Sequence, residues 1–266
     1  MVDTGRSVHS DGRLAEPWLA PGKDWDAVAD LRFEQIESGA DISYRRVLVP
    51  AIENLLTDLP GLSAANVVDV GCGTGYLTGI LAKSAEHVDA TDPSFQSIAI
   101  ARAKHSASNI RYYQQEIESF GAPARRGRYQ IAVANMVLMC VSDLTATLRS
   151  VAELLAPGGR LVATIPHPAH WAAYAGYLDK PWYDPRAELE SQIRVAWRYR
   201  VSTDDREGSE VVHYLRSMTS YSRALESNGM GIEKIRELFP DAETEKMYPE
   251  RWEFPRYLAF QAKRQS

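Results

Sequence analysis

The sequence has few cysteines and no long apolar run. Cys72 and Cys140 are the two cysteines among 266 residues, which excludes a disulfide framework and a cysteine-based zinc knuckle. No stretch approaches the ~18 consecutive apolar residues of a membrane span. The segment from Met1 to Ala15 is polar and holds no apolar signal core, which predicts a cytoplasmic protein. Small secreted scaffolds, membrane proteins and cysteine-based metal domains are therefore not expected.

The sequence also lacks an excess of positive charge. It holds 30 Lys and Arg against 35 Asp and Glu, so the formal net charge is −5. Proteins that hold a phosphate backbone usually carry the opposite sign. The basic cluster Arg125-Arg126-Gly127-Arg128 is short, and we interpret it as a solvated loop. We therefore expect neither nucleic acid nor a membrane as a partner.

From Asn66 onward, short β-branched runs alternate with segments of helical periodicity. This alternation predicts right-handed βαβ units and a mostly parallel sheet that is covered by helices on both faces. The expected strands cover residues 66–70, 87–91, 110–113, 129–134, 160–165, 232–239 and 257–263. The expected helices cover residues 25–38, 42–56, 75–84, 94–105, 143–155 and 219–228. We expect Gly39 to end the first helix, Ser142 to cap the helix that follows it, and Pro157-Gly158-Gly159 to interrupt the chain.

Residues 166–216 depart from the alternation and are rich in Trp and Tyr. We interpret them as an insertion that caps a substrate site, because aromatic walls suit a small, partly aromatic ligand. The alternative is a satellite core beneath a long insertion. The expected organisation is an N-terminal extension with a lid helix (1–40), a core (41–165), the aromatic cap (166–216) and the C-terminal part of the core (217–266).

The segment from Val67 to Tyr76 places a strand, a glycine loop and a helix in that order. Glycines at positions 71, 73 and 75 let the backbone approach a ligand, and ligands of open parallel sheets bind at the carboxyl ends of the strands. A dinucleotide fingerprint would need glycine where Tyr76 stands. A phosphate-binding P-loop would need a lysine before Lys83. Diphosphate ligands, and with them a nicotinamide-dependent reductase, are thereby disfavoured.

Three acidic residues follow three successive strands: Asp69, Asp92 and Glu116. Asp69 would repel a diphosphate but suits a ligand with an ammonium and a sulfonium group. Asp92 stands where an acid can accept both hydroxyls of a ribose. Glu116 can accept an exocyclic adenine amine, with Ile117 packed on the ring. Each acid alone could be a solvated loop carboxylate; together they indicate an adenosine with a cationic amino-acid tail.

The glycine loop and these acids resemble the class I S-adenosylmethionine (SAM)-dependent methyltransferases, in particular their small-molecule branch. The resemblance covers residues 42–165 well and residues 217–263 loosely. It implies an α/β fold with helices on both faces of a seven-stranded, mostly parallel sheet. Residues 257–263 would form its antiparallel last strand, with N-terminal helices and the aromatic cap added. It implies SAM as cofactor, S-adenosylhomocysteine (SAH) as product, and no metal. Glu116 departs mildly from the family, which more often has Asp there.

The resemblance also implies roles for individual residues. The methionine end of SAM would be lined by Asp69, Gly71, Cys72 and Gly73, and its ammonium would meet a backbone carbonyl at Asn135-Met136. The ribose would be held by Asp92 beside Pro93-Ser94, and the adenine by Glu116 and Ile117. The SAM carboxylate would be covered by Tyr44 and Arg45, although a plain surface helix explains that short match equally well.

Two histidines directly follow the fifth strand, in the segment Ile165-Pro-His-Pro-Ala-His170. His167 and His170 are candidate general bases, because imidazole titrates near neutral pH. The alternative for His167 is a histidine that hydrogen-bonds a lid loop. No third ligand of matching spacing accompanies the pair, so we expect no metal. Candidate substrate contacts are His167, Trp171, Tyr174, Tyr183, His213 and Arg216, although Arg216 could equally form a structural ion pair.

The sequence thus predicts an enzyme that transfers a methyl group from SAM to a small molecule, with oxygen favoured as the acceptor atom and natural-product or secondary metabolism as its setting. Methylation at nitrogen or carbon, methylation of RNA or protein, and a non-catalytic SAM-binding protein are the alternatives. The identity of the acceptor, the need for a base and the oligomeric state stay open, with a homodimer as one option.

Overall fold

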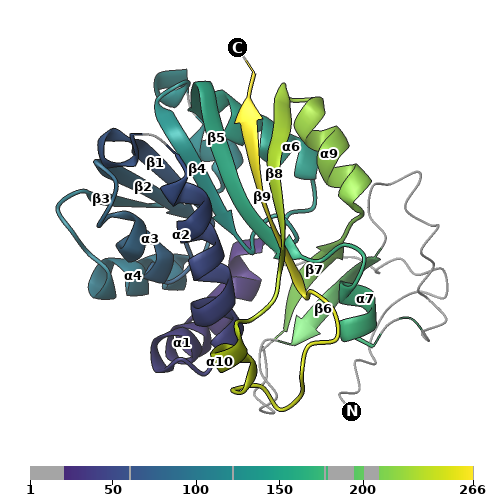
Figure 1. The fold of residues 1–266 in the computed structure, drawn as a ribbon. Coiled ribbons are helices and arrows are strands. Elements are labelled where there is room, and N and C mark those ends of the chain that lie inside the picture. Colours follow the sequence, from purple (N-terminus) through teal and green to yellow (C-terminus); the bar gives the residue numbers. More distant parts are fainter. Residues whose placement is uncertain are drawn as a thin grey trace.

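Seven strands form one mixed sheet in the order β3-β2-β1-β4-β5-β9-β8 (Figure 1). The structure is a computed structural model, and it describes residues 21–59, 61–121, 123–176, 178, 195–200 and 210–265. The strands of the sheet are β1 (Asn66–Val70), β2 (His87–Asp92), β3 (Ile110–Gln114), β4 (Tyr129–Asn135), β5 (Leu155–Pro166), β8 (Met230–Leu238) and β9 (Tyr257–Arg264).

Strands β3, β2, β1, β4 and β5 are paired in parallel, whereas β9 runs antiparallel to both of its neighbours, β5 and β8. This confirms the predicted seven-stranded sheet with an antiparallel last strand. Because β1 to β4 are parallel neighbours, their carboxyl ends lie at one edge of the sheet. The loops that follow these strands therefore meet there.

Alternate side chains of the central strands pack against helices on opposite faces, as the period of two requires. Val67 packs in the cluster that contains Leu55, on the face covered by α2 (Val49–Thr57), whereas Val68 packs in the cluster that contains Leu148, on the face covered by α6 (Leu144–Leu154). Figure 1 shows α2 in front of the sheet and α6 behind it. The other helices of the sheet are α3 (Tyr76–Leu81), α4 (Phe95–Lys104), α5 (Ile117–Phe120) and α9 (Met218–Glu226).

Several boundaries differ from the prediction by a few residues, and two of the differences have a clear local cause. Asp143, rather than Ser142, caps α6, because its carboxylate accepts a hydrogen bond from the backbone N–H of Ala146 at 2.9 Å. Pro157-Gly158-Gly159 does not interrupt the chain but lies inside β5. The register with β4 shifts in this region, and Gly158 adopts a positive φ of 75°. The proline and the two glycines therefore lie in an irregular part of β5, and the strand continues on both sides of them.

The N-terminal helix and part of the insertion lie beyond the carboxyl ends of the parallel strands (Figure 1). Helix α1 (Pro21–Ser38) packs on α4 and contacts β7. It ends at Gly39, as predicted, with φ at 78°. The π-helical turn η1 (Tyr44–Leu48) leads from there into α2. The insertion holds α7 (Trp171–Tyr174) and an antiparallel pair, β6 (Val195–Arg200) and β7 (Glu210–Leu215), that the sequence analysis did not anticipate.

The remaining short elements are η2 (Leu62–Ala64), η3 (Pro123–Arg125) and α10 (Ala242–Glu245). Within the described part of the chain, no helix combines the length and the apolar character that crossing a membrane would require. The division of the chain at residues 40, 165 and 216 stays a prediction.

Candidate active site

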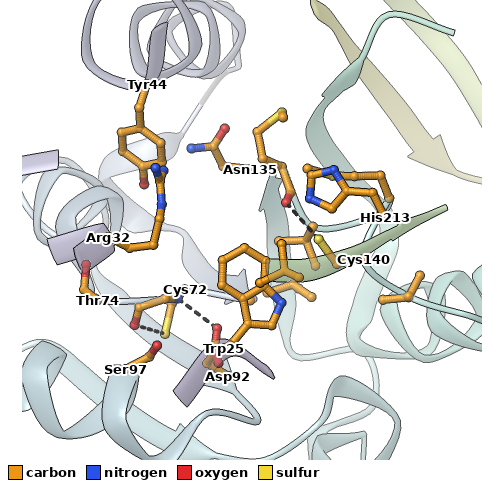
Figure 2. A pocket seen from close by; sticks show the side chains of 18 of the residues that line it. Trp25, Arg32, Tyr44, Cys72, Thr74, Asp92, Ser97, Asn135, Cys140 and His213 are labelled. Carbon is orange, nitrogen blue, oxygen red and sulfur yellow. Dashed lines mark hydrogen bonds between the residues drawn. The ribbon is translucent and has the colours of Figure 1, made fainter. Parts of the chain in front are cut away.

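A cavity of about 810 Å³ lies at the carboxyl ends of β1 to β4. Its volume is within the range of roughly 300–1,000 Å³ that is typical of small-molecule sites. Helix α1 and η1 line it from one side, and α7 and β7 from another. Figure 2 shows Arg32 and Tyr44 on one side of this pocket and Cys140 and His213 on the other. Of the predicted site residues, the cavity is lined by Tyr44, Gly71, Cys72, Gly73, Asp92, Pro93, Glu116, Ile117, Asn135, Met136, Trp171, Tyr174 and His213.

The glycine loop approaches the neighbouring strand ends closely. The backbone N–H groups of Gly71 and Cys72 donate to the carbonyl of Thr91 at 2.8 and 3.1 Å. Gly71 has φ at 64°, and a Cβ at this position would lie 2.5 Å from a methyl carbon of Val137. Gly73 is also left-handed, with φ at 54°, but a Cβ there would meet open space. Only glycine at position 71 lets the loops after β1 and β4 come together.

The side chain of Asp92 is held by two backbone hydrogen bonds. Its two carboxylate oxygens accept the backbone N–H groups of Ser94 and Gly73, each at 2.9 Å. A carboxylate has about four lone-pair sites, so acceptor capacity remains for hydroxyl groups in the cavity. Burial raises the pKa of Asp92 to about 6, even though the two backbone hydrogen bonds oppose the shift. The structure thus places an acceptor at the end of β2 inside the cavity.

Asp69 lies behind the glycine loop and is not among the residues that line the cavity. Its carboxylate is 1% exposed and accepts the hydroxyl of Thr78 in α3 at 2.6 Å. Burial raises the pKa of Asp69 to about 7. The charge of Asp69 still acts on the cavity, because it raises the pKa of Tyr44, which lines it. Of the three strand-end acids, Asp92 and Glu116 therefore line the cavity, whereas Asp69 is buried against α3.

The end of β4 carries an unusual backbone conformation. Met136 has φ at 58°, and it is the sole non-glycine residue with a positive φ in the described ranges. Such a conformation costs about 1–3 kcal/mol and persists where the surroundings hold it. Here the N–H of Met136 donates to both oxygens of Thr164 at 3.1 Å, and the Thr164 hydroxyl donates to Asn135 at 2.5 Å. The strained residue borders the cavity directly.

The N-terminal elements bring polar side chains over the strand ends. Tyr44 is partly buried. Loss of solvent and the charge of Asp69 raise the pKa of its hydroxyl, whereas a hydrogen bond with Asn135 opposes the shift. Arg32 of α1, which the sequence analysis did not single out, lines the cavity and donates to Asp41 at 2.9 Å. Arg45 lies elsewhere: its guanidinium donates to the carbonyl of Glu37 at 3.0 Å and does not line the cavity. The structure therefore separates Tyr44 from Arg45.

The far end of the cavity has aromatic walls. Trp171 and Tyr174 come from α7, and their ring centroids are 5.1 Å apart. Tyr248 and Tyr257 also line the cavity, although they lie outside the predicted cap. Arg256 holds this wall from behind, with its guanidinium carbon 4.3 Å from the ring centroid of Tyr174 and 5.7 Å from that of Tyr248. The concentration of aromatic residues between positions 248 and 257 was the signal that could have identified this wall.

The histidines are placed differently from one another. His167 is 5% exposed and does not line the cavity; its Nε2 lies 3.3 Å from Glu237, and burial lowers its pKa. His170 stacks on Phe254 and does not line the cavity either. These contacts resemble the alternative that the sequence left open, a histidine that holds a loop. His213 of β7 does line the cavity, and burial lowers its pKa to about 4.

Three other predicted residues lie away from the cavity or cannot be placed. Arg216 is 2% exposed and donates to the backbone carbonyls of Leu138, Val141 and Ser142, so it holds the loop after β4. Ser94 is buried beneath the start of α4 and does not line the cavity. Tyr183 lies outside the described residues. In the described part of the chain, no three metal-binding side chains are grouped as a metal site would need.

Comparison with known proteins identifies the family to which this chain is related. A family model described as "Methyltransferase domain" matches residues 42–234. A curated relative, the ubiquinone biosynthesis O-methyltransferase of Sodalis glossinidius, is 33% identical over 112 residues. The match covers 41% of this chain and 45% of that relative, so the chain spans less than half of the relative's length.

Solved structures resemble the chain over most of its length. A SAM-dependent methyltransferase from Mesorhizobium loti matches 81% of this chain and 96% of its own, with a TM-score of 0.60 and 23% identity. A 1,6-didemethyltoxoflavin-N1-methyltransferase from Burkholderia thailandensis matches 95% of this chain and 94% of its own, with a TM-score of 0.58 and 14% identity. At these identities the solved structures show a shared fold alone.

Proposed function

The chain belongs to the methyltransferase domain family, and from this premise we propose that it transfers a methyl group from SAM to a hydroxyl oxygen of a small, planar molecule. The observation that carries the proposal is the position of Asp92. Its carboxylate lies at the end of β2, is fixed by the glycine loop through the N–H of Gly73, and borders the cavity. This is the arrangement that an adenosine ribose requires.

In this proposal the cofactor lies along the strand ends. Asp92 would accept the ribose hydroxyls, and Ile117 and Glu116 would hold the adenine ring and its amine. Gly71, Gly73 and the carbonyls near Asn135 would hold the methionine end and its ammonium group. The buried carboxylate of Asp92 favours a cationic ligand over an anionic one, because opposite charges attract strongly where water is excluded.

Methyl transfer requires little from the protein beyond the alignment of the reacting atoms. The sulfonium of SAM already activates its methyl group, so an acceptor oxygen must be held in line with the methyl carbon and the sulfur. Proximity and orientation of this kind can supply roughly 7–11 kcal/mol. The oxygen forms a bond to the methyl carbon, the carbon–sulfur electron pair returns to sulfur, and the acceptor proton leaves to a base or to water. The products are the methyl ether, SAH and a proton.

The aromatic walls support a small planar acceptor. Trp171, Tyr174, Tyr248 and Tyr257 border the far end of the cavity and offer flat apolar surfaces with polar tips. Transfer to oxygen draws support from the name of the curated relative, an O-methyltransferase of ubiquinone biosynthesis. RNA acceptors are disfavoured because the net charge is −5, the same sign as a phosphate backbone.

Calorimetry with SAM and SAH tests the cofactor half of this proposal, and we expect both to bind. No binding at millimolar SAM would overturn it. The acceptor half is tested by incubating the full chain with SAM and matched phenols, catechols and anilines, with detection of SAH and of the methylated product by mass spectrometry. We expect the hydroxyl compounds to be methylated. Product from the anilines alone would overturn transfer to oxygen, and SAM binding without any SAH release would favour a non-catalytic protein.

We expect SAH binding to depend on pH through Asp92. The ionised carboxylate accepts hydrogen bonds from the ribose, whereas the protonated form has lost acceptor capacity. Since the pKa of Asp92 is raised to about 6, affinity should be constant above pH 7 and fall as pH decreases through 6, approaching tenfold per pH unit below it. Calorimetry between pH 5 and pH 8 checks this. A flat profile would remove Asp92 from the ribose contact.

The two histidine positions predict different kinetics. His213 lines the cavity with a neutral imidazole, so in this proposal it accepts the proton of the acceptor hydroxyl, whereas His167 contacts Glu237 outside the cavity. Removing a general base usually costs about 10²–10⁴-fold in rate. With the acceptor that the panel identifies, His213→Asn should therefore lower kcat about a hundredfold without changing SAH affinity, and His167→Asn should leave kcat within about threefold. The reverse result would support the sequence-based assignment of His167 as the base.

A further inference from the structure

Helix α1 is attached to α4 by polar contacts along its length. Asp26 of α1 accepts the backbone N–H of Gln96 at the beginning of α4, and Asp30 accepts the side-chain amide of Gln96 at 3.2 Å. Near the end of both helices, a carboxylate oxygen of Glu37 lies 2.9 Å from the His105 imidazole. Contacts of this kind form and separate in water at low cost, unlike the packed apolar clusters beneath the sheet. Val28 and Ala29 of α1 are buried as well, so apolar packing holds the helix and the polar contacts fix its position on α4.

Asp26 makes the most organised contact of this interface. One of its carboxylate oxygens accepts the hydroxyl of Ser94 at 2.7 Å and the backbone N–H of Gln96 at 2.9 Å. The same Ser94 hydroxyl accepts the N–H of Ser97 at 3.0 Å and so caps α4. Asp26 thus joins α1 to the first turn of α4 through Ser94, whose hydroxyl is fixed by its hydrogen bond with the N–H of Ser97.

Ser94 connects this contact to the cofactor site. Its hydroxyl donates to Asp26, and its backbone N–H donates to Asp92 at 2.9 Å. A continuous chain of hydrogen bonds therefore runs from α1 through Ser94 and Asp92 to the N–H of Gly73 in the glycine loop. The two carboxylates also interact electrostatically, because the charge of Asp26 raises the pKa of Asp92. A displacement of α1 would change both the position of Ser94 and the field at Asp92.

The other face of α1 borders the cavity. Trp25, Arg32 and Ile36 line it, and α1 also contacts β7, which contributes His213. The helix therefore spans from the proposed ribose contact to the proposed acceptor end. Movement of this one helix would open both halves of the site, and its return would complete both.

We propose that Asp26 is a positioning residue that latches α1 over bound cofactor and, through Ser94, holds Asp92 toward the ribose. The inference rests on the proposed function, because it takes SAM and SAH as the ligands. Closure of α1 and correct placement of Asp92 then occur as one event. Loss of the latch speeds the release of SAH more than it slows its entry.

The test measures SAH binding and release by the full chain. Stopped-flow tryptophan fluorescence follows both rates, since Trp25 borders the cavity, and calorimetry gives the affinity. Asp26→Ala should raise the SAH dissociation rate about tenfold, the typical effect of losing hydrogen bonds to a charged group. Asp26→Asn keeps the oxygen that accepts both hydrogen bonds, so it should restore most of the slow release.

Asp30→Ala is the matched control, because Asp30 lies on the same helix, contacts the same Gln96 and does not line the cavity. Its SAH dissociation rate should stay within twofold of the original chain. Equal rates for Asp26→Ala and Asp30→Ala would overturn the inference while leaving the proposed function intact. Failure of the original chain to bind SAH would instead overturn the proposed function.

Hydrogen exchange provides a second measurement that does not depend on Asp26→Ala being stable. In the original chain, saturating SAH should slow the exchange of α1 backbone amides at least fivefold, since a closed helix opens less often. In Asp26→Asn the slowing should be largely kept. If SAH leaves the exchange of α1 in the original chain unchanged, the helix does not close on the cofactor and the latch is wrong.

Discussion

Asp92→Ala is expected to weaken SAH binding about a hundredfold. In the proposed complex this carboxylate accepts two ribose hydroxyls, and hydrogen bonds to a charged group contribute roughly 1.5–3 kcal/mol each. Every 1.4 kcal/mol corresponds to about a tenfold change in affinity. The substitution also releases the N–H groups of Gly73 and Ser94, which loosens the glycine loop. Calorimetry measures the affinity, and circular dichroism shows whether the variant is folded.

Glu116→Gln is the comparison within the same cavity. Glu116 is exposed and lines the pocket, and glutamine keeps a carbonyl that can accept the adenine amine. We expect SAH affinity to change less than about threefold. Unchanged affinity in folded Asp92→Ala would contradict the proposed ribose contact, and an equal loss in both variants would mean that the cavity responds to any lost negative charge.

Gly71→Ala is expected to destabilise the fold by about 2–5 kcal/mol and to abolish SAH binding. The left-handed φ of 64° costs an L-residue roughly 1–2 kcal/mol. The added methyl group would also lie 2.5 Å from Val137, and forcing extra atoms into a packed site typically costs about 1–3 kcal/mol. Urea unfolding measures the free energy, and calorimetry measures the binding.

Two variants separate these causes. Gly73→Ala carries the same backbone penalty without a clash, because a Cβ there would meet open space, so it should destabilise by only about 1–2 kcal/mol. Val137→Ala in the Gly71→Ala background removes the clashing methyl groups and should recover part of the loss, which a double-mutant cycle measures. A Gly71→Ala variant as stable as Gly73→Ala would show that the loops after β1 and β4 do not meet as described.

Local features of the chain were largely predictable from the sequence. The strands that surround the glycine loop and the end of α1 at Gly39 follow from β-branched runs and helical spacing. Since the strands are parallel, Asp92 and Glu116 had to reach the same edge of the sheet, and the cavity does contain both. The cap of α6 was misplaced by one residue, because Ser142 and Asp143 are both good capping residues and only the backbone geometry selects between them.

The alternation of side chains along β1 decided whether Asp69 faces the cavity or the opposite side of the sheet. Asp69 stands between Val68 and Val70, whose side chains pack on the face that α6 covers. A period of two therefore turns Asp69 to the opposite face, where it meets Thr78 of α3 instead of the cavity. The sequence alone identified the acid but not the direction of its side chain.

What the sequence by itself determined is one half of the candidate site: a short, contiguous glycine loop and acids at strand ends. Their meeting place follows from the parallel pairing of the strands. Only the tertiary structure decided the other half. Arg32 of α1, Tyr248 and Tyr257 of β9 come from distant segments, and each reaches the cavity through the packing of its surroundings against the sheet. Such contacts depend on which apolar surfaces bury one another, and no spacing within a single segment encodes that choice.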